Sequence, residues 1–328
     1  MTTQELTTSE APTVSVIMPA YGVAKYISAA LDSIFAQTFQ DYEIIVVNDG
    51  SLDTTELELA IAPYRDRIVY IEQENRGCSA ARNAAIRVAR GRYIALLDAD
   101  DLWQPDYLAI QIERLENDRS IDVIYPNALI FGDSPKSGKL FMELLPSDGE
   151  VTLEKLISQR CNVMISVTAR REAIVRAGLF DENLRSSEDF DMWLRILLQG
   201  GRICYHRRVL VHYRQRRESL SANPVSMCQH ILRVFEGVQQ RNHLTPAQQE
   251  SLQRAKDHFS ALLNLCEGKR AFFDGDTDRA IEKLTEANRF FRRTKIQLAL
   301  LLLRAAPQFA LWVYDLRDRF VVGMSTRF

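Results

Sequence analysis

Apolar runs that alternate with helical patterns over the first third of this 328-residue chain constrain its fold more than any other feature. Short β-rich runs lie at Val14–Met18, Tyr42–Asp49 and Arg92–Leu97, and helical patterns lie between them at Ile27–Phe35 and Ser79–Gly91. Ser79 is the expected N-cap of the second helix. The second run is almost entirely apolar, as expected of a strand buried on both faces of a parallel sheet. The alternation predicts right-handed β-α-β units and an α/β fold, with a mixed, mainly parallel sheet flanked by helices.

Polar and acidic residues follow three of the predicted strands at their carboxyl ends. Pro19–Tyr21 follow the first strand, Asn48–Asp49 end the second, and Asp98, Asp100 and Asp101 follow the third. Ligands bind beyond the carboxyl ends of strands in such sheets, so we expect the three loops to meet at one crevice. Asp98 and Asp100 would repel each other unless a cation lay between them, and their oxygens favour Mg²⁺ or Mn²⁺. The alternative is that Asp101 simply caps the next helix.

Other templates for binding calcium or phosphate fail on specific residues. An EF-hand would need Gly where Trp103 stands and Glu where Ala109 stands. The stretch from Gly132 to Gly138 is one residue too long for a Walker A motif, and Leu140 occupies its Ser/Thr position. No G-x-G-x-x-G follows the first strand. Ordinary ATP and dinucleotide sites are therefore not expected.

An aspartyl-phosphate enzyme remains an alternative. Asp98 and Asp100 have the spacing of its nucleophile and its acid/base, although Leu102 replaces the small hydroxyl residue or Val usual in that motif. A catalytically silent protein that binds a sugar nucleotide or acts as a scaffold is a second alternative.

Composition excludes several further classes. Hydrophobic residues make up 46% and charged residues 26% of the chain, as in globular proteins with a sizeable core. The 41 Lys and Arg against 43 Asp and Glu create no basic field, so no nucleic-acid partner is expected. Five scattered cysteines form no C-x-x-C pair, which argues against a zinc site or a disulfide framework and indicates reduced thiols in the cytoplasm. Ile296–Leu303 is the longest apolar stretch, and it is too short to span a bilayer.

The chain is expected to have three parts. Residues 1–12 are a polar, flexible lead-in, residues 13–223 form the α/β domain, and residues 224–328 form a helical region that contains a pair resembling a tetratricopeptide unit. The tail mixes Leu, Trp and Phe with Arg and Lys. It is either an interfacial helix at the inner face of the membrane or a helix packed on its own domain or on a second copy in a homo-oligomer.

Four motifs, in order, carry a family resemblance. They are "VSVIMPAY", "YEIIVVNDGSLDTT", "ENRGCSAARNAAIRVARGRYIALLDADDLWQPDYL" and "SEDFDMWLR", the last together with the basic segment "VHYRQRRESLS". Together they resemble the inverting GT-A glycosyltransferases of family 2 over roughly Val14–Ser221. The resemblance implies that residues 13–223 are a GT-A domain that uses a nucleotide-diphosphate sugar, with a UDP-sugar as the expected donor. It implies a sugar or lipid-linked glycan acceptor in surface polysaccharide or glycan synthesis. Gln215-Arg216-Arg217 does not complete the Q-x-x-R-W signature of processive relatives, which favours addition of one sugar at a time.

The resemblance also implies roles for individual residues. Asp98 and Asp100 match the D-x-D motif that holds Mn²⁺ or Mg²⁺. Asp189, in the motif with Glu188, matches the general base that takes the proton from the acceptor hydroxyl. From the residues alone, Glu188 and Asp189 could equally favour the positive start of a helix. The implied nucleotide-binding residues are Pro19, Ala20, Tyr21, Asp49, Arg76, Arg82 and Asp98, and His212, Tyr213 and Arg217 match a loop that closes over the diphosphate.

Overall fold

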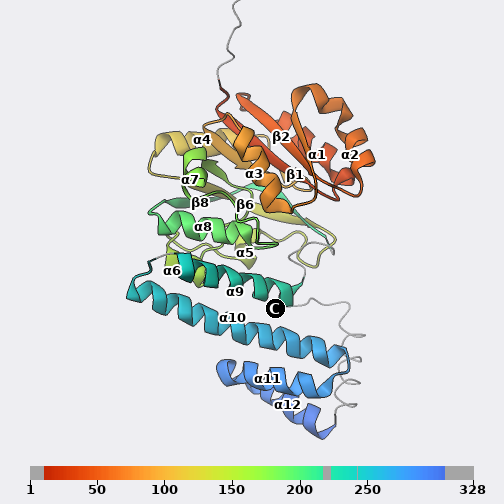
Figure 1. The fold of residues 1–328 in the computed structure, drawn as a ribbon, viewed down its shortest axis with the longest axis vertical. Coiled ribbons are helices and arrows are strands. Elements are labelled where there is room, and N and C mark those ends of the chain that lie inside the picture. Colours follow the sequence, from red (N-terminus) through yellow and green to blue (C-terminus); the bar gives the residue numbers. More distant parts are fainter. Residues whose placement is uncertain (1–10, 217–222, 242, 307–328) are drawn as a thin grey trace, which may run out of the picture. The chain divides into compact units, whose positions relative to one another are not determined.

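The computed structural model describes residues 11–216, 223–241 and 243–306, which divide into two compact units (Figure 1). Unit 1 comprises the described chain up to Phe131 together with Gly138–Arg214. Unit 2 comprises Gly132–Ser137 and the described chain from Gln215 onward. The boundary predicted from the sequence, near Asn223, lies at the start of α9 (Pro224–Arg241).

Unit 1 alternates strands and helices, as the sequence predicts. Its elements are β1 (Val14–Ala20), α1 (Ala24–Phe35), β2 (Tyr42–Asp49), α2 (Thr54–Ile61), the 3-10 helix η1 (Ala62–Arg67), β3 (Val69–Gln73), α3 (Cys78–Val88), β4 (Tyr93–Leu96), β5 (Leu102–Trp103), α4 (Tyr107–Asn117), β6 (Val123–Gly132), α5 (Phe141–Leu144), α6 (Leu153–Ile157), β7 (Thr168–Arg170), α7 (Arg171–Arg176), α8 (Glu188–Leu198) and β8 (Ile203–Gln215).

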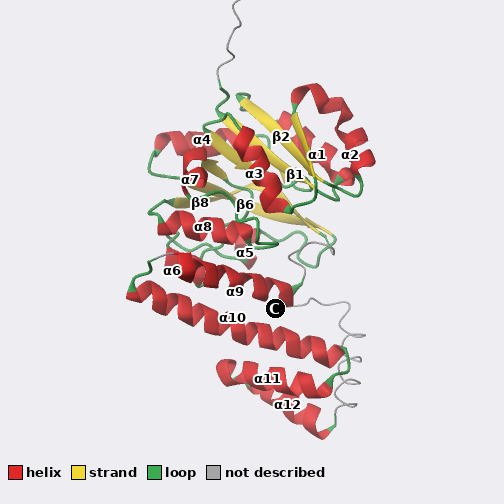
Figure 2. Cartoon of the chain, in the orientation of Figure 1, coloured by secondary structure: helices red, strands yellow, loops and turns green. Residues whose placement is uncertain are grey.

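The strands of the described chain form one eight-stranded sheet in the order β3-β2-β1-β4-β7-β6-β8-β5, shown in yellow in Figure 2. The four strands from β3 to β4 run parallel, whereas β7 is antiparallel to both β4 and β6, and β5 is antiparallel to β8. Ile17 of β1 is in register with Ile45 of β2 and with Leu96 of β4. The predicted mixed sheet flanked by helices is therefore confirmed, and its parallel pairs join the four strands from β3 to β4.

Apolar burial on both sides of the parallel strands holds this arrangement. In α1 the buried residues are Ile27, Ala30, Leu31 and Ile34, which share one face at helical spacing. Helix α3 packs against both β1 and β2. Burial of each large aliphatic side chain contributes about 1.5–3 kcal/mol. The carboxyl ends of the parallel strands therefore lie at one edge of the sheet, and the loops after β1, β2 and β4 all begin there.

Two helix starts differ from the sequence prediction. Helix α3 begins at Cys78 with Gly77 at its N-cap, so Ser79 lies buried inside the first turn instead of capping it. Gly77 has a φ of +90°, and its N–H donates to Asp49 Oδ2 over 2.8 Å. Asp101 is not a helix cap either, because α4 starts only after Asp106. The residues after Asp101 instead extend into β5 and pair with β8.

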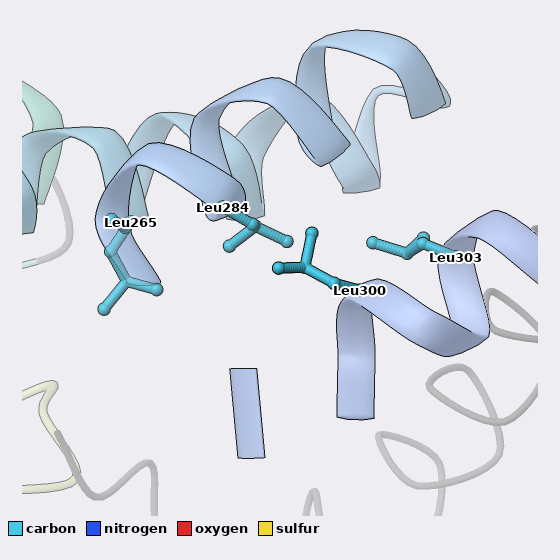
Figure 3. Close-up of a cluster of buried hydrophobic side chains, with 5 residues drawn as sticks. Leu265, Leu284, Leu300 and Leu303 are labelled. Carbon is cyan, nitrogen blue, oxygen red and sulfur yellow. The ribbon is translucent and has the colours of Figure 1, made fainter. Parts of the chain in front are cut away.

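Unit 2 is helical and builds its own apolar core. It contains α9, α10 (Pro246–Phe273), α11 (Thr277–Phe291) and α12 (Thr294–Ala305). The segment that resembles a tetratricopeptide pair folds as the end of α10 and as α11. Figure 3 shows Leu265, Leu284, Leu300 and Leu303 of the buried cluster that joins α10, α11 and α12.

No described helix is long and apolar enough to cross a membrane. The part of the amphipathic tail from residue 307 onward lies outside the described residues, as does Arg217.

Candidate active site

The loops after β1 and β2 are hydrogen-bonded to each other at the carboxyl edge of the parallel strands. Gly22 N–H donates to Ser51 Oγ over 2.7 Å, and Ala24 N–H donates to Asp53 Oδ2 over 3.0 Å. Among the predicted nucleotide contacts, Tyr21 is 47% exposed, whereas the Ala20 side chain is fully buried. The backbone of Ala20 is buried as well, so Tyr21 is the residue of this pair that presents a surface to a ligand.

Asp49, at the end of β2, organises the segment that leads into α3. Its Oδ1 accepts from Gln73 Nε2 over 2.7 Å and from Arg76 N–H over 2.9 Å, and its Oδ2 accepts from Gly77 N–H over 2.8 Å. The residue is only 3% exposed. Each carboxylate oxygen has two lone pairs, so Asp49 can still accept a hydrogen bond from a ligand.

The two predicted arginines have opposite environments. The Arg76 side chain is 62% exposed and pairs with Glu182 over 2.7 Å. The Arg82 side chain is 3% exposed and bonds two carboxylates, Asp98 Oδ1 over 2.8 Å and Glu188 Oε1 over 2.5 Å. Burial acts to lower the pKa of Arg82, but Cys78, Asp98 and Glu188 together raise it well above its ordinary value. Arg82 thus brings the two acidic motifs of the sequence together.

The acidic loop after β4 contains two kinds of carboxylate. Asp98 and Asp100 are partly exposed, whereas Asp101 is 1% exposed. Burial raises the pKa of Asp101 well above its usual range, and the charges of Asp100 and Asp98 add to the effect. Asp101 Oδ1 accepts from Arg214 N–H over 2.7 Å. Asp101 is therefore an internal anchor of the loop, and its neighbours are the pair that can face a ligand.

The acids of this loop fit a cation that is shared with a substrate. The described residues contain no group of three or more His, Cys, Asp or Glu side chains placed to hold a metal ion. Mg²⁺, however, is usually bound in phosphate-transfer sites by one or two carboxylates plus the phosphates of the substrate. The Asp98 and Asp100 pair supplies such a donor set.

Glu188 and Asp189 form the first turn of α8. Ser187, which precedes them, has a left-handed backbone with a φ of +60°. The pKa of Asp189 is raised to about 7, chiefly by burial and also by the Glu188 charge, against the opposing effect of Arg82. The carboxyl Oδ1 of Asp189 accepts from Phe190 N–H over 2.7 Å. Asp189 is thus a carboxyl group that can change protonation state near neutral pH, as a general base must.

Residues of β8 complete the surroundings of the acidic loop. His212 Nε2 lies 2.8 Å from Gln104 Nε2, and the Tyr213 ring packs edge-on against Phe141. Arg214, which the sequence analysis did not single out, donates from Nε to the carbonyl oxygen of Asp100 over 2.7 Å. Its position within the basic stretch around β8 was the only sequence signal for it.

Solved structures with similar folds identify the class. The mannosyltransferase PcManGT from Pyrobaculum calidifontis, in complex with GDP-Man and Mn²⁺, matches with a TM-score of 0.61 and 21% identity, over 94% of this chain and 88% of that one. S. aureus TarS 1-349 matches with a TM-score of 0.57 and 20% identity, over 96% of this chain and 93% of that one. The fold is that of the GT-A glycosyltransferases.

Sequence comparison identifies the family. Residues 15–175 match the family model described as glycosyl transferase family 2. An uncharacterized glycosyltransferase of Methanocaldococcus jannaschii is 32% identical over 210 residues, which are 62% of this chain and 71% of that protein. One from Rickettsia bellii is 33% identical over 229 residues, which are 65% of this chain. The chain belongs to glycosyltransferase family 2. It spans only 32% of the R. bellii protein and 64% of a Rickettsia typhi relative.

Proposed function

We propose that this family 2 glycosyltransferase transfers one sugar at a time, with inversion at the anomeric carbon, from a nucleotide-diphosphate sugar to an acceptor hydroxyl. The observation that carries the proposal is the joining of two acidic motifs through one buried arginine at the carboxyl edge of the sheet. One motif has the chemistry of a cation site, and the other contains a carboxyl group whose pKa is raised to about 7.

The donor nucleotide is proposed to lie against the loops after β1 and β2. Tyr21 is exposed and Pro19 is partly exposed, and the buried Ala20 joins them in the chain. Asp49 Oδ2, which accepts one hydrogen bond from the protein, offers its second lone pair to a base N–H. A UDP-sugar is the proposed donor, supported by the similar fold of TarS, which has been solved with UDP and with UDP-GlcNAc. PcManGT was solved with GDP-Man, so guanine nucleotides belong in the test.

Asp98 and Asp100 are proposed to hold Mn²⁺ or Mg²⁺ together with the donor diphosphate. When bound, the cation would supply Lewis-acid stabilisation of the departing diphosphate. The chain itself places the two carboxylates, because Arg82 fixes Asp98 and Arg214 bonds the backbone carbonyl of Asp100. Arg76, which is exposed, is the proposed contact from the protein to the outer face of the diphosphate.

Asp189 is proposed to take the proton from the acceptor hydroxyl as that oxygen attacks the anomeric carbon. A general base works best when its pKa lies near the working pH, and burial brings the pKa of Asp189 to about 7. Attack from the face opposite the diphosphate inverts the configuration. The proton ends on the Asp189 carboxyl group and the bonding electrons leave with the diphosphate.

The acceptor is proposed to be a glycan in polysaccharide synthesis. Support comes from the chondroitin synthase of Escherichia coli, which is 31% identical over 216 residues, although this chain covers only 30% of it. An aspartyl-phosphate phosphatase is not favoured, because the chain belongs to a transferase family. A silent sugar-nucleotide-binding protein is the alternative that an experiment must exclude.

The test combines binding and transfer. Purified protein is first heated with UDP, GDP and other nucleoside diphosphates, with and without Mn²⁺, because a ligand that binds only the folded state raises Tm. For each nucleoside diphosphate that binds, the protein is then incubated with the corresponding nucleotide sugars and a panel of glycan acceptors. Nucleotide release and the anomeric configuration of the product are measured, and we expect release of UDP and an inverted product.

Asp189→Asn separates the transferase from a silent binder. We expect it to bind the nucleotide about as tightly as the wild type and to lose transfer by roughly 10²- to 10⁴-fold. Glu113→Gln, which changes an exposed acid on α4, is the matched control and should transfer normally. Unchanged transfer by Asp189→Asn would remove Asp189 from the mechanism.

A further inference from the structure

Arg82 lies where three distant parts of unit 1 meet. It stands on α3, and its partners Asp98 and Glu188 are 16 and 106 residues away in the sequence. We propose that Arg82 is a positioning residue that sets the separation of these two carboxylates, in place of the contact with the donor diphosphate that the family resemblance implies. The catalytic part of this inference rests on the proposed function.

The donors of Arg82 point at the protein. Nη2 donates to Asp98 and Nη1 donates to Glu188, and only 3% of the side chain is exposed. Its guanidinium carbon lies 5.5 Å from the centre of the Phe180 ring. Because only 3% of the side chain is exposed, a phosphate could reach the guanidinium group only if Arg82 or the residues that cover it moved. Arg82 is therefore placed to act on the reaction through the acids that it holds.

The backbone around Arg82 is fixed by its neighbour. Asn83 Nδ2 donates to the carbonyl oxygen of Phe180 over 2.8 Å, and Phe180 N–H donates to Asn83 Oδ1 over 2.9 Å. This pair of buried hydrogen bonds ties α3 to the segment that leads into α8. The backbone of Arg82 is thereby held relative to that segment, and burial of its side chain limits how far the guanidinium group can move.

The two ion pairs of Arg82, with Asp98 and Glu188, form a bridge that reaches the start of α8. Glu188 is its first residue, and the preceding Ser187 has a left-handed backbone, which is unfavourable for a non-glycine residue and must be held by surrounding contacts. Asp189 follows directly. Arg82 thus ties the turn that presents the proposed base to Asp98, on the loop of the proposed cation site.

A lysine cannot replace this geometry. The guanidinium has two separate NH₂ groups in a rigid plane, and each bonds one carboxylate, whereas an ammonium group is a compact point charge. A residue that serves only as a positive charge would be replaced adequately by Lys. A residue that positions two acids would not.

The first test measures kcat and nucleotide affinity separately. We expect Arg82→Lys to lower kcat at least tenfold while the Kd for UDP, measured by calorimetry without metal, changes less than threefold. Arg87→Gln is the matched control, because Arg87 is on the same helix but is 56% exposed and pairs with Glu182 at the surface. It should change neither quantity. A wild-type kcat in Arg82→Lys, or a tenfold loss of metal-free UDP affinity, would overturn the proposal.

The second test needs no activity and therefore survives a failure of the proposed function. Asp98→Asn, Glu188→Gln and the double variant are unfolded in urea, with and without Arg82→Gln. Loss of both carboxylates leaves a buried cation without a partner. Each single variant raises the unfolding equilibrium constant by some factor. The factor for the double variant should be at least ten times the product of the two single factors. This excess should vanish with Arg82→Gln. Multiplicative effects would show that Arg82 does not couple the two acids.

If the wild-type protein transfers no sugar but the excess is found, the proposed function fails and the bridge stands.

Discussion

The backbone N–H of Arg214 donates to the buried Oδ1 of Asp101 over 2.7 Å, and Nε of the same arginine donates to the carbonyl oxygen of Asp100 over 2.7 Å. The guanidinium carbon also lies 4.6 Å from the centre of the Tyr26 ring and 4.2 Å from that of Phe131. One residue near the end of β8 thus ties the acidic loop to α1 and β6.

Removal of the Asp101 carboxyl group should loosen this loop. Asp101→Ala leaves the Arg214 N–H without its acceptor, and an unsatisfied buried donor costs about 1–3 kcal/mol. Urea unfolding measures the loss. Asp148→Ala, in which the lost carboxylate is 71% exposed and pairs with Arg160, should cost less than about 1 kcal/mol. Equal costs for the two variants would show that Asp101 is not an anchor.

The pKa of Asp189 predicts how activity depends on pH. Burial raises this pKa to about 7, and the base must be ionised to accept a proton. Transfer should therefore fall as the pH drops below about 7 and level off above it. The pH profile of kcat/KM measures this limb for the free enzyme. A profile that stays flat down to pH 5 would exclude Asp189 as the base.

The same pKa predicts the opposite dependence for stability. The folded state favours the neutral form of Asp189. The stability that this residue contributes is therefore fully present below the unfolded pKa of about 3.9, and it is lost as the pH rises through the folded pKa of about 7. Asp189→Asn should gain stability relative to the wild type across this range while it loses transfer. A stability difference that is independent of pH would show that the pKa is not raised.

The fold and the acidic motifs could be predicted because both are local patterns. The runs that form β1, β2 and β4 carry their own periodicity, and Asp98, Asp100, Glu188 and Asp189 lie in short recognisable strings. The contacts that join these motifs could not be predicted, because they link residues far apart in the sequence. Arg82 and Glu188 are 106 residues apart, and Arg214 and Asp101 are 113 residues apart. The cap predictions failed for the same reason. Tertiary hydrogen bonds to Asp49 and Asp101 outweighed the local preference for Ser and Asp at helix starts.

His206 should make unit 1 sensitive to acid. Its Nε2 lies 2.9 Å from Gln111 Oε1, while its Nδ1 is buried without a hydrogen-bond partner. Burial lowers the pKa of His206 to about 4, and Arg114 and Arg208 add to the shift. His206 therefore becomes protonated near pH 6.5 in the unfolded chain but only near pH 4 in the folded protein. The free energy of unfolding should fall by up to about 3 kcal/mol between pH 6.5 and 4.

A conservative variant isolates this effect. His206→Gln keeps a side-chain donor for Gln111 but cannot titrate, so its unfolding free energy should lose much less between pH 6.5 and 4. Exposed His243→Gln is the control and should follow the wild type. If His206→Gln shows the full acid loss, other groups cause it.

Gly50 should be indispensable for the loop that Asp49 organises. It has a φ of +61°, and a Cβ added to it would lie 2.7 Å from the backbone nitrogen of Asn75. Alanine there must push away the segment whose Arg76 and Gly77 N–H groups bond Asp49. We expect Gly50→Ala to weaken nucleotide binding in the calorimetric assay and to destabilise the fold by more than the backbone strain alone.

Gly22 supplies the matched control for that strain. Its φ is +63°, but a Cβ added there would meet nothing within 4 Å. Gly22→Ala should therefore lose only about 1–2 kcal/mol, the cost of a left-handed backbone for a residue with a side chain. The difference between the two variants measures the close approach between the loop after β2 and the segment before α3. If both variants lose the same stability, that approach does not constrain the site.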